Sequence, residues 1–235
     1  FYFWDSSRVV ASILSERTFF SVKLSIAAAT AATLLSLTLA VPAAYALSRF
    51  EFRGRVLIDT MLELPMIVSP AALGAMLLIF FNNPAGTWVQ EHQAQFVFTA
   101  SGIVLAQFVT TLGVTTRLVK AAMDEIPSSY EDVARTLGAS PLDAFCSVTL
   151  PLSKNGILAA AALTWAKALG EFGATITIGG SMAMKTETLP VAIFMRLATA
   201  DIEGTVALIL LLTSIGLALL FGARLLTGAA KQRRI

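Results

Sequence analysis

Four long stretches of this chain contain no formally charged side chain, and they constrain its fold more than any other feature. They hold 25, 27, 24 and 20 residues and lie between Lys23 and Arg49, Glu63 and Glu91, His92 and Arg117, and Glu203 and Arg224. A helix that crosses the hydrocarbon core of a bilayer needs about 20 apolar residues, so each stretch can span a membrane. A fifth interval, residues 155–184, is also long enough but contains Lys167 and Glu171.

The composition favours helices in lipid over a soluble fold. Hydrophobic residues make up 56% of the 235 residues, charged residues only 14%, and the mean hydropathy is +0.76. Long runs of Ala, Leu and Ile lack the alternation that a transmembrane barrel strand requires. We therefore predict an all-α integral membrane protein with a single domain over residues 1–235. Its five transmembrane helices are expected over residues 17–48, 60–81, 97–120, 154–178 and 203–226.

The distribution of Lys and Arg predicts an orientation. With the N-terminus outside, eleven of the 17 basic residues fall on the cytoplasmic side, five fall outside, and Lys167 remains in the membrane. Cytoplasmic loops carry the excess of basic residues in most membrane proteins, so we expect the N-terminus of this chain outside and its C-terminus in the cytoplasm. The basic residues are scattered rather than gathered in a patch, which argues against a nucleic-acid partner.

A polar segment at residues 127–151 interrupts the apolar pattern on the predicted cytoplasmic side. Ser128 is expected to cap a short helix, with Glu131 completing a capping box. Gly138 supplies a left-handed residue that ends this helix, and Ser140 caps a second one. Helices this short are not stable alone in water, so they pack either on their own chain or on a partner. The small side chains around Gly138 favour the partner.

The same segment resembles the EAA coupling loop of ABC importer permeases, whose pattern is E-A-A-x3-G-x9-I-x-L-P. The matching residues are Asp132, Val133, Ala134, Gly138, Val148, Leu150 and Pro151. Two departures are mild, with Asp132 in place of Glu and Val133 in place of Ala. The runs ARTLGAS, WAKALGEFGATIT and Thr188-Leu189-Pro190 are similar to permeases for molybdate, tungstate and sulfate, and most similar to molybdate permeases.

The resemblance implies a membrane subunit that imports molybdate or tungstate by alternating access, with sulfate or thiosulfate as alternatives. It implies a homodimer with a second copy, two ATP-binding cassette subunits that hold ATP and Mg, and an external oxyanion-binding protein. The chain has no G-x-x-x-x-G-K-[ST] phosphate loop, so we expect no cofactor and no catalytic residue in it. The implied location is the plasma membrane of a prokaryote. The family core of six helices implies that the first is missing or truncated here.

The resemblance also implies an ATPase-docking surface on the loop. The residues assigned to this surface are Glu131, Asp132, Val133, Ala134, Arg135, Leu137, Gly138, Ala139, Ser140, Leu150 and Pro151. Arg135 is the candidate for a charge contact, and Gly138 is needed for its backbone shape.

A second group of residues is a candidate for the translocation path or its gate. This group comprises Glu63, Pro65, Ser69, Pro70, Lys167 and Glu171. Lys167 and Glu171 are four residues apart and can pair on one helical face, either to lock helices together or to line a gate. The order Lys then Glu is the weaker one for such a pair, which leaves open a partner on another helix or chain. The two prolines either break a span near its inner end, beside a cavity, or Pro65 simply begins the helix.

Several hydroxyl side chains are available as donors to a tetrahedral oxyanion, namely Ser69, Thr110, Thr111, Thr115, Thr164 and Thr175. No cluster of His, Cys and carboxylates with metal-ligand spacing is present in the sequence. A function of another class, an ion-coupled secondary transporter, would use Lys167 and Glu171 as its charge relay. The two-helix loop and the lack of an inverted internal repeat favour the ATP-driven importer.

Overall fold

The computed structural model describes residues 6–232, with side chains for residues 9–225. These residues form helices, with no strand among them. The first six are α1 (Ser6–Ile13), α2 (Glu16–Arg49), α3 (Arg55–Ile67), α4 (Pro70–Phe81), α5 (Pro84–His92) and α6 (Ala100–Asp124). They are followed by α7 (Ser129–Thr136), α8 (Pro141–Ala144), a π-helical turn (Phe145–Thr149), α9 (Leu150–Leu169), α10 (Gly173–Gly179), α11 (Leu189–Ala198) and α12 (Ile202–Gln232).

Four helical segments in the described part are long and apolar enough to cross a membrane. They are α2, α6, the continuous run from α8 through the π-helical turn to α9, and α12. A fifth apolar segment consists of α3 and α4, which are bent by 108° relative to each other. The predicted all-α membrane architecture is confirmed, because these segments provide four spans, or five if the bent pair counts as one.

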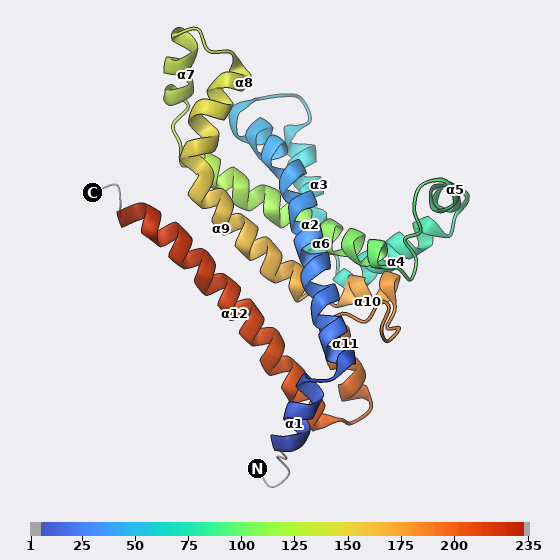
Figure 1. Cartoon of the computed structure of the whole chain (residues 1–235). Helices are drawn as coiled ribbons and strands as arrows, with labels where there is room; N and C mark the ends of the chain where they lie inside the picture. The colour runs from blue at the N-terminus through green and yellow to red at the C-terminus, as the bar shows by residue number, and fades with distance from the viewer. Residues whose placement is uncertain (1–5, 233–235) are drawn as a thin grey trace.

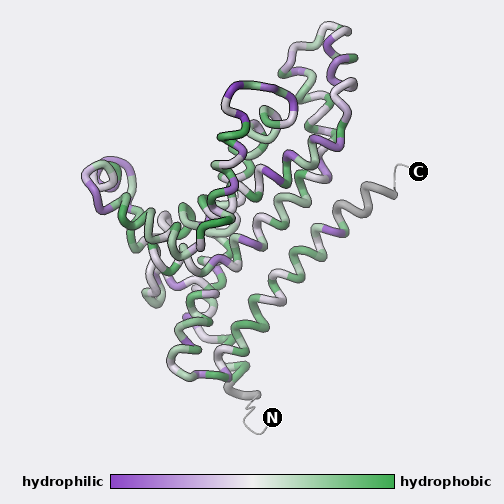
Figure 2. Tube along the Cα trace, turned by 180° about the vertical axis from the view of Figure 1, so that it is seen from behind, coloured by the Kyte–Doolittle hydropathy of each residue, from purple (hydrophilic) through white to green (hydrophobic). Residues whose placement is uncertain are grey.

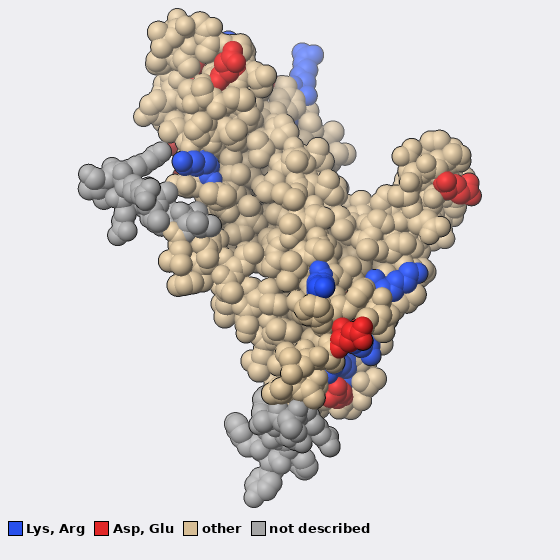
Figure 3. Space-filling view, viewed as in Figure 1, with Lys and Arg blue, Asp and Glu red and all other residues tan. Residues whose placement is uncertain are grey.

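The long helix α2 runs between two ends of the molecule, and α6 crosses it obliquely (Figure 1). We call the end that holds α7, α8 and the connection at residues 50–54 the coupling end. The opposite end holds α1, α11 and the beginning of α12. Hydrophilic residues concentrate in the loops and in α7, whereas α12 is apolar along most of its length (Figure 2). On the face drawn in Figure 3, acidic and basic groups gather near the opposite end, and a broad surface with few charges lies above them.

The bend between α3 and α4 follows from the prolines. Pro70 is the first residue of α4, and Ser69 before it is extended (φ −62°, ψ 143°), as expected because proline disfavours a helical conformation in the preceding residue. The Ser69 hydroxyl caps α4 by accepting a hydrogen bond from the Ala72 amide at 3.3 Å. Pro65 lies inside α3. The alternative that Pro65 begins a helix is therefore wrong, and residues 60–81 form two helices rather than one.

The helix predicted over residues 154–178 is also divided. It begins earlier, at Leu150, and ends at Leu169, after which Phe172 leaves helical geometry and α10 begins at Gly173. The turn places α10 directly against α4, where a Cβ atom on Gly173 would lie 2.9 Å from the amide nitrogen of Ala71. A side chain larger than hydrogen would collide there, so the close approach of α10 to α4 requires this glycine.

Hydroxyl groups join the central helices α2, α6 and α9. The Ser36 hydroxyl of α2 lies 3.0 Å from that of Thr111 on α6, and the hydroxyls of Thr115 on α6 and Thr164 on α9 are 2.9 Å apart. All four side chains are buried within the single chain. Hydrogen bonds of this kind hold helices together in lipid, where apolar surfaces alone give no preference for protein over lipid.

Glycines permit the closest helix crossings. A Cβ atom built at Gly113 of α6 would overlap the carbonyl oxygen of Leu62 on α3. By contrast, a Cβ atom at Gly216 of α12 would meet nothing within 4 Å. Comparing the same substitution at these two glycines therefore separates the effect of helix propensity from the effect of close packing.

We expect Gly113→Ala to destabilise the fold by about 1–3 kcal/mol, because the added methyl group forces α3 away from α6. Gly216→Ala is the matched control, since alanine is favoured over glycine by about 1 kcal/mol inside a helix with free space around it. Thermal unfolding of the purified protein in detergent measures both. Equal midpoints for the two variants would contradict the close contact at Gly113.

Candidate functional site

The start of the coupling loop differs from its prediction. Ser128 has helical backbone angles (φ −60°, ψ −24°), and its side chain makes no capping hydrogen bond to α7. The predicted capping box with Glu131 is therefore wrong. The reason is that the Glu131 carboxylate turns inward, to partners elsewhere in the chain, and is not available to the Ser128 amide.

The elbow between the two short helices is built as predicted. Gly138 has a positive φ of 96°, and the Ala139 amide donates to the Ala134 carbonyl at 3.1 Å, which ends α7. At the start of α8 the Ser140 hydroxyl accepts from the Asp143 amide, and the Asp143 carboxylate accepts from the Ser140 amide, both at 3.2 Å. This is the capping box that fixes the direction in which α8 leaves the elbow.

The loop returns to the bundle without a break. Helix α8 continues through the π-helical turn (Phe145–Thr149) into α9. Short π-helical segments inside α-helices are rare and occur frequently at functional sites. Helices α8 and α9 therefore share one continuous helical backbone, with the π-helical turn as its irregularity.

The Glu131 carboxylate holds the loop on the bundle. It accepts hydrogen bonds from Arg49 Nε at 2.7 Å, from the Tyr45 hydroxyl at 2.9 Å and from the Thr149 hydroxyl. Arg49 also donates through Nη2 to the Ile126 carbonyl at 2.8 Å. Both charged side chains are largely buried. We call this set of contacts the loop lock, because it joins the end of α2, the end of α6, α7 and the π-helical turn before α9.

The loop lock changes the acidity of Glu131. Burial alone would raise the pKa of this carboxyl, but hydrogen bonds from Thr149, Arg49 and Tyr45 and the charge of Arg49 outweigh burial and lower the pKa below its ordinary value of 4.5. The ionised form of Glu131 is therefore the one that the folded protein stabilises. Sequence reasoning missed all three partners, because nothing in the local pattern links the end of α2 to Glu131.

The structure places the predicted docking residues around the elbow. Asp132, Val133, Arg135, Leu137, Gly138, Ser140 and Pro151 are exposed, Ala134, Ala139 and Leu150 are partly buried, and Glu131 is buried. Glu131 therefore supports the surface from below rather than lying on it. Two leucines project from the loop, with Leu137 84% exposed and Leu142 70% exposed. Both leucines lie on a polar segment at the coupling end, outside the long apolar stretches of the helices that can cross a membrane.

The second predicted group does not form one cluster. Lys167 and Glu171 are not paired, because the helix that would align them ends at Leu169. The Glu171 carboxylate is instead buried and accepts from the Ala174 amide at 3.2 Å, at the beginning of α10. Glu63 forms an ion pair with Arg117 of α6, which fixes α3 beside the bend at Ser69.

All of the candidate hydroxyls except that of Thr175 have structural partners. Thr111, Thr115 and Thr164 join helices inside the chain, and Thr110 donates to the Gln107 carbonyl at 3.1 Å. Thr175 is buried and, within the described part of the chain, has no hydrogen-bond partner. Among the described residues, no three His, Cys, Asp or Glu side chains are grouped so that they could hold a metal ion.

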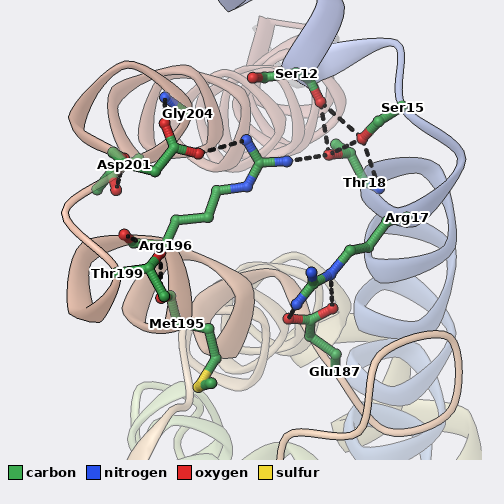
Figure 4. A network of polar contacts seen from close by, with 11 residues as sticks. Ser12, Ser15, Arg17, Thr18, Glu187, Met195, Arg196, Thr199, Asp201 and Gly204 are labelled. Atoms are coloured by element: carbon green, nitrogen blue, oxygen red, sulfur yellow. Dashed lines mark hydrogen bonds and ion pairs between the residues drawn. The ribbon is translucent and has the colours of Figure 1, made fainter.

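Two arginines organise the opposite end (Figure 4). Arg17 of α2 makes a bidentate contact with Glu187, with Nε and Nη2 at 2.7 and 2.6 Å from the two carboxylate oxygens. Glu187 is completely buried. Arg196 of α11 bridges Asp201 at 3.4 Å and the Thr18 hydroxyl at 3.5 Å. These contacts tie the beginning of α2 to α11 and α12, and no sequence motif pointed to them.

Comparison with known proteins agrees with this architecture. Residues 32–231 match the family described as binding-protein-dependent transport system inner membrane component. The sulfate transport permease CysT of Escherichia coli K12 is 34% identical over 192 residues, which cover 81% of this chain and 69% of the relative. The molybdenum transport permease ModB of Haemophilus influenzae is 36% identical over 186 residues (78% and 81%). ModB of Escherichia coli K12 is 33% identical over 214 residues (88% and 92%).

Solved structures share the fold at lower sequence identity. A chain of a bacterial ABC transporter that imports the polysaccharide alginate superposes with a TM-score of 0.77 at 16% identity, covering 96% of this chain and 82% of that chain. A chain of the methionine ABC transporter MetNI in inward-facing conformations gives a TM-score of 0.68 at 16% identity (92% and 99%).

The chain belongs to the family of binding-protein-dependent transport system inner membrane components. It is the integral inner-membrane permease subunit of an ABC importer. Permeases of this class work with ATPase subunits and a periplasmic binding protein, as in the alginate importer, which has been seen in complex with its periplasmic protein.

We expect Glu131→Gln to destabilise the protein by about 3 kcal/mol at neutral pH, because it leaves the buried Arg49 guanidinium without its counter-charge. The folded-state pKa of Glu131 is lowered, so the stability that its charge contributes is fully present above about pH 4.5 and is lost as the pH falls through the lowered pKa. The difference between wild type and variant should therefore be constant from neutral pH to about pH 5 and shrink below that.

The exposed neighbour Asp132 provides the control for this experiment. Asp132→Asn should change the stability by less than about 0.5 kcal/mol, as for most surface substitutions. Unfolding midpoints in detergent, measured as a function of pH, compare the two variants. A Glu131→Gln protein as stable as Asp132→Asn at pH 7 would show that the loop lock does not hold the loop.

Proposed function

We propose that this permease imports a tetrahedral oxyanion, molybdate or tungstate, through a pathway formed by two copies of the chain. The relatives support this class of substrate, since they include permeases named for molybdenum and for sulfate transport. The WAKALGEFGATIT block at residues 165–177 supports this oxyanion group, and the overall resemblance of the chain to molybdate permeases supports molybdate within it. One observation carries the proposal of ATP-driven transport: a rigid polar loop, locked to the bundle by Glu131, presents uncovered Leu137 and Leu142.

In this proposal the loop docks on an ATP-binding cassette subunit that holds ATP and Mg. Two such subunits serve the two permease copies. The exposed residues Leu137 and Leu142 enter the ATPase surface, Arg135 supplies a charge contact, and the elbow at Gly138 sets their relative position. The coupling end is then cytoplasmic, with the C-terminus on the same side and the N-terminus outside. The excess of basic residues on that side supports this orientation.

Movement of the loop reaches the membrane by two routes. The π-helical turn carries it into α9, and the loop lock carries it into α2 through Arg49. Helix α9 ends at Leu169, two residues before the buried Glu171, and the bend at Ser69 lies between α3 and α4. Packed helices have discrete arrangements rather than a continuous range, so these interruptions are where alternating access would change the shape of the pathway.

The external oxyanion-binding protein is expected to deliver its cargo at the opposite end. The arginine network around Arg17 and Arg196 fixes α2, α11 and α12 there and provides a rigid platform. The alternative of an ion-coupled secondary transporter depended on a relay between Lys167 and Glu171. No observation in the described residues favours that alternative, since the two side chains do not meet.

The substrate proposal is tested with the assembled complex in vesicles. We expect the complex, with ATP inside the vesicles and the binding protein outside, to take up labelled molybdate and tungstate in preference to sulfate. Uptake of sulfate without uptake of molybdate or tungstate would show that sulfate is the substrate instead. Uptake driven by an ion gradient without ATP would contradict the ATP-driven mechanism.

Docking through the elbow is tested with a pair of glycines. Gly138 and Gly54 have φ values of 96° and 94°, and neither has an atom within 4 Å of a built Cβ. A left-handed conformation costs other residues about 1–2 kcal/mol, so Gly138→Val and Gly54→Val carry the same strain at the same end of the molecule. We expect only Gly138→Val to lose ATPase stimulation by the loaded binding protein, and Gly138→Asn to retain part of it. Equal coupling in the two valine variants would contradict docking at the elbow.

A further inference from the structure

Lys167 lies at the middle depth of the bundle. Its neighbours Trp165 and Leu169 pack against Ala29, near the midpoint of α2, and against the α12 residues Leu212, Ile215 and Leu219. Helix α9 accordingly ends about halfway along α2 and α12 (Figure 1). With a hydrocarbon core about 30 Å thick, the nearer interface is roughly 15 Å away. That distance is too great for a lysine side chain to reach the headgroups from this position.

The side chain of Lys167 points away from α2 and α12, which pack on α9 at this level, whereas α6 contacts α9 about one turn earlier, at Thr164. The Trp165 indole N–H donates to the Thr30 hydroxyl of α2 at 3.0 Å. Successive helix residues are about 100° apart, so Lys167 projects about 200° around the helix from Trp165. It is exposed in the single chain. The ammonium group therefore faces a space that neither α2 nor α12 fills.

No carboxylate in the described part of the chain compensates Lys167. The ion pairs there involve other cations, and Glu171, the nearest acid in sequence, is buried against the Ala174 amide. Glu171 has an exposed fraction of only 5%. The beginning of α10 is a favourable position for a negative charge. Glu171 is therefore stabilised there and does not compensate the charge of Lys167.

The helix dipole at the end of α9 does not by itself offset the cost of placing the Lys167 charge in the membrane. Lys167 lies in the last turn of α9, where the helix dipole favours a cation by about 0.3–1 kcal/mol. Placing a lysine at the centre of a membrane helix costs about 2.5–3.5 kcal/mol even on the most lenient scale. The dipole therefore offsets less than half of the cost. The remainder requires water or an anion in front of the ammonium group.

We propose that Lys167 faces the water-filled passage formed with the second copy of the chain, and that its ammonium group contacts the oxyanion as it passes. The inference rests on the proposed function and adds the residue that selects for charge. Two copies supply two ammonium groups, which match the two negative charges of a tetrahedral dianion. A strongly hydrated lysine holds an anion as a point charge, without the bidentate grip of arginine, and this suits an ion that must leave again.

The test uses the full complex with its ATPase and binding protein in vesicles, and labelled molybdate as the probe. We expect Lys167→Met to assemble and to hydrolyse ATP when the loaded binding protein is added, while molybdate uptake per ATP hydrolysed falls at least tenfold. Lys167→Arg keeps the charge, so its uptake should exceed that of Lys167→Met severalfold. Lys154→Met, an exposed lysine at the other end of α9, is the matched control and should transport as wild type does.

Two results would overturn the role of Lys167 and leave the proposed function intact. One is wild-type uptake per ATP in Lys167→Met. The other is failure of Lys167→Met to assemble together with restored assembly in Lys167→Arg, which would show that the ammonium group binds a carboxylate of another subunit. Absence of tetrahedral oxyanion uptake by the wild-type complex would instead overturn the proposed function, and the role of Lys167 with it.

Discussion

The contact between the buried Glu131 carboxylate and Arg49 is the interaction on which the coupling loop depends. Two helices of eight and four residues cannot hold their shape in water. They do so here because one ionised group, with three side-chain donors around it, joins α2, α7 and the π-helical turn before α9. A buried pair of this kind gains little net stability over an apolar contact, but it is costly to break. The loop is therefore fixed in one arrangement relative to the bundle.

The two interruptions in the membrane segments lie next to each other and stabilise each other. Helix α10, which follows the break after Leu169, packs against α4, which follows the bend at Ser69. Irregular backbone at membrane depth is tolerated only where protein or a water-filled cavity covers it. Each new helix is also capped by its own chain, α4 by the Ser69 hydroxyl and α10 by the Glu171 carboxylate. Ser69 and Glu171, which the sequence suggested as pathway residues, thus have a structural role at the beginning of α4 and α10.

Prediction from the sequence succeeded where the cause is local. Charge-free intervals located the apolar segments, and the elbow at Gly138 and the cap at Ser140 follow rules that involve only a few neighbouring residues. Prediction failed where a distant partner competes. The capping box predicted at Ser128 does not form, because its acidic residue, Glu131, pairs instead with Arg49, 82 residues away in the chain. The pair of Lys167 and Glu171 failed because its spacing assumed a helix that ends at Leu169.

The buried hydroxyls change how the passage has to work. Thr111, Thr115 and Thr164 were candidates to bind an oxyanion, but they hold α2, α6 and α9 together. In lipid, such hydrogen bonds between helices replace the hydrophobic effect as a source of specificity, so these groups cannot serve both purposes at once. In the passage that we propose between two copies of the chain, an oxyanion therefore meets few fixed donors and is held weakly. Weak holding is compatible with import only if selection precedes entry and if some positive charge lowers the barrier in the middle of the membrane.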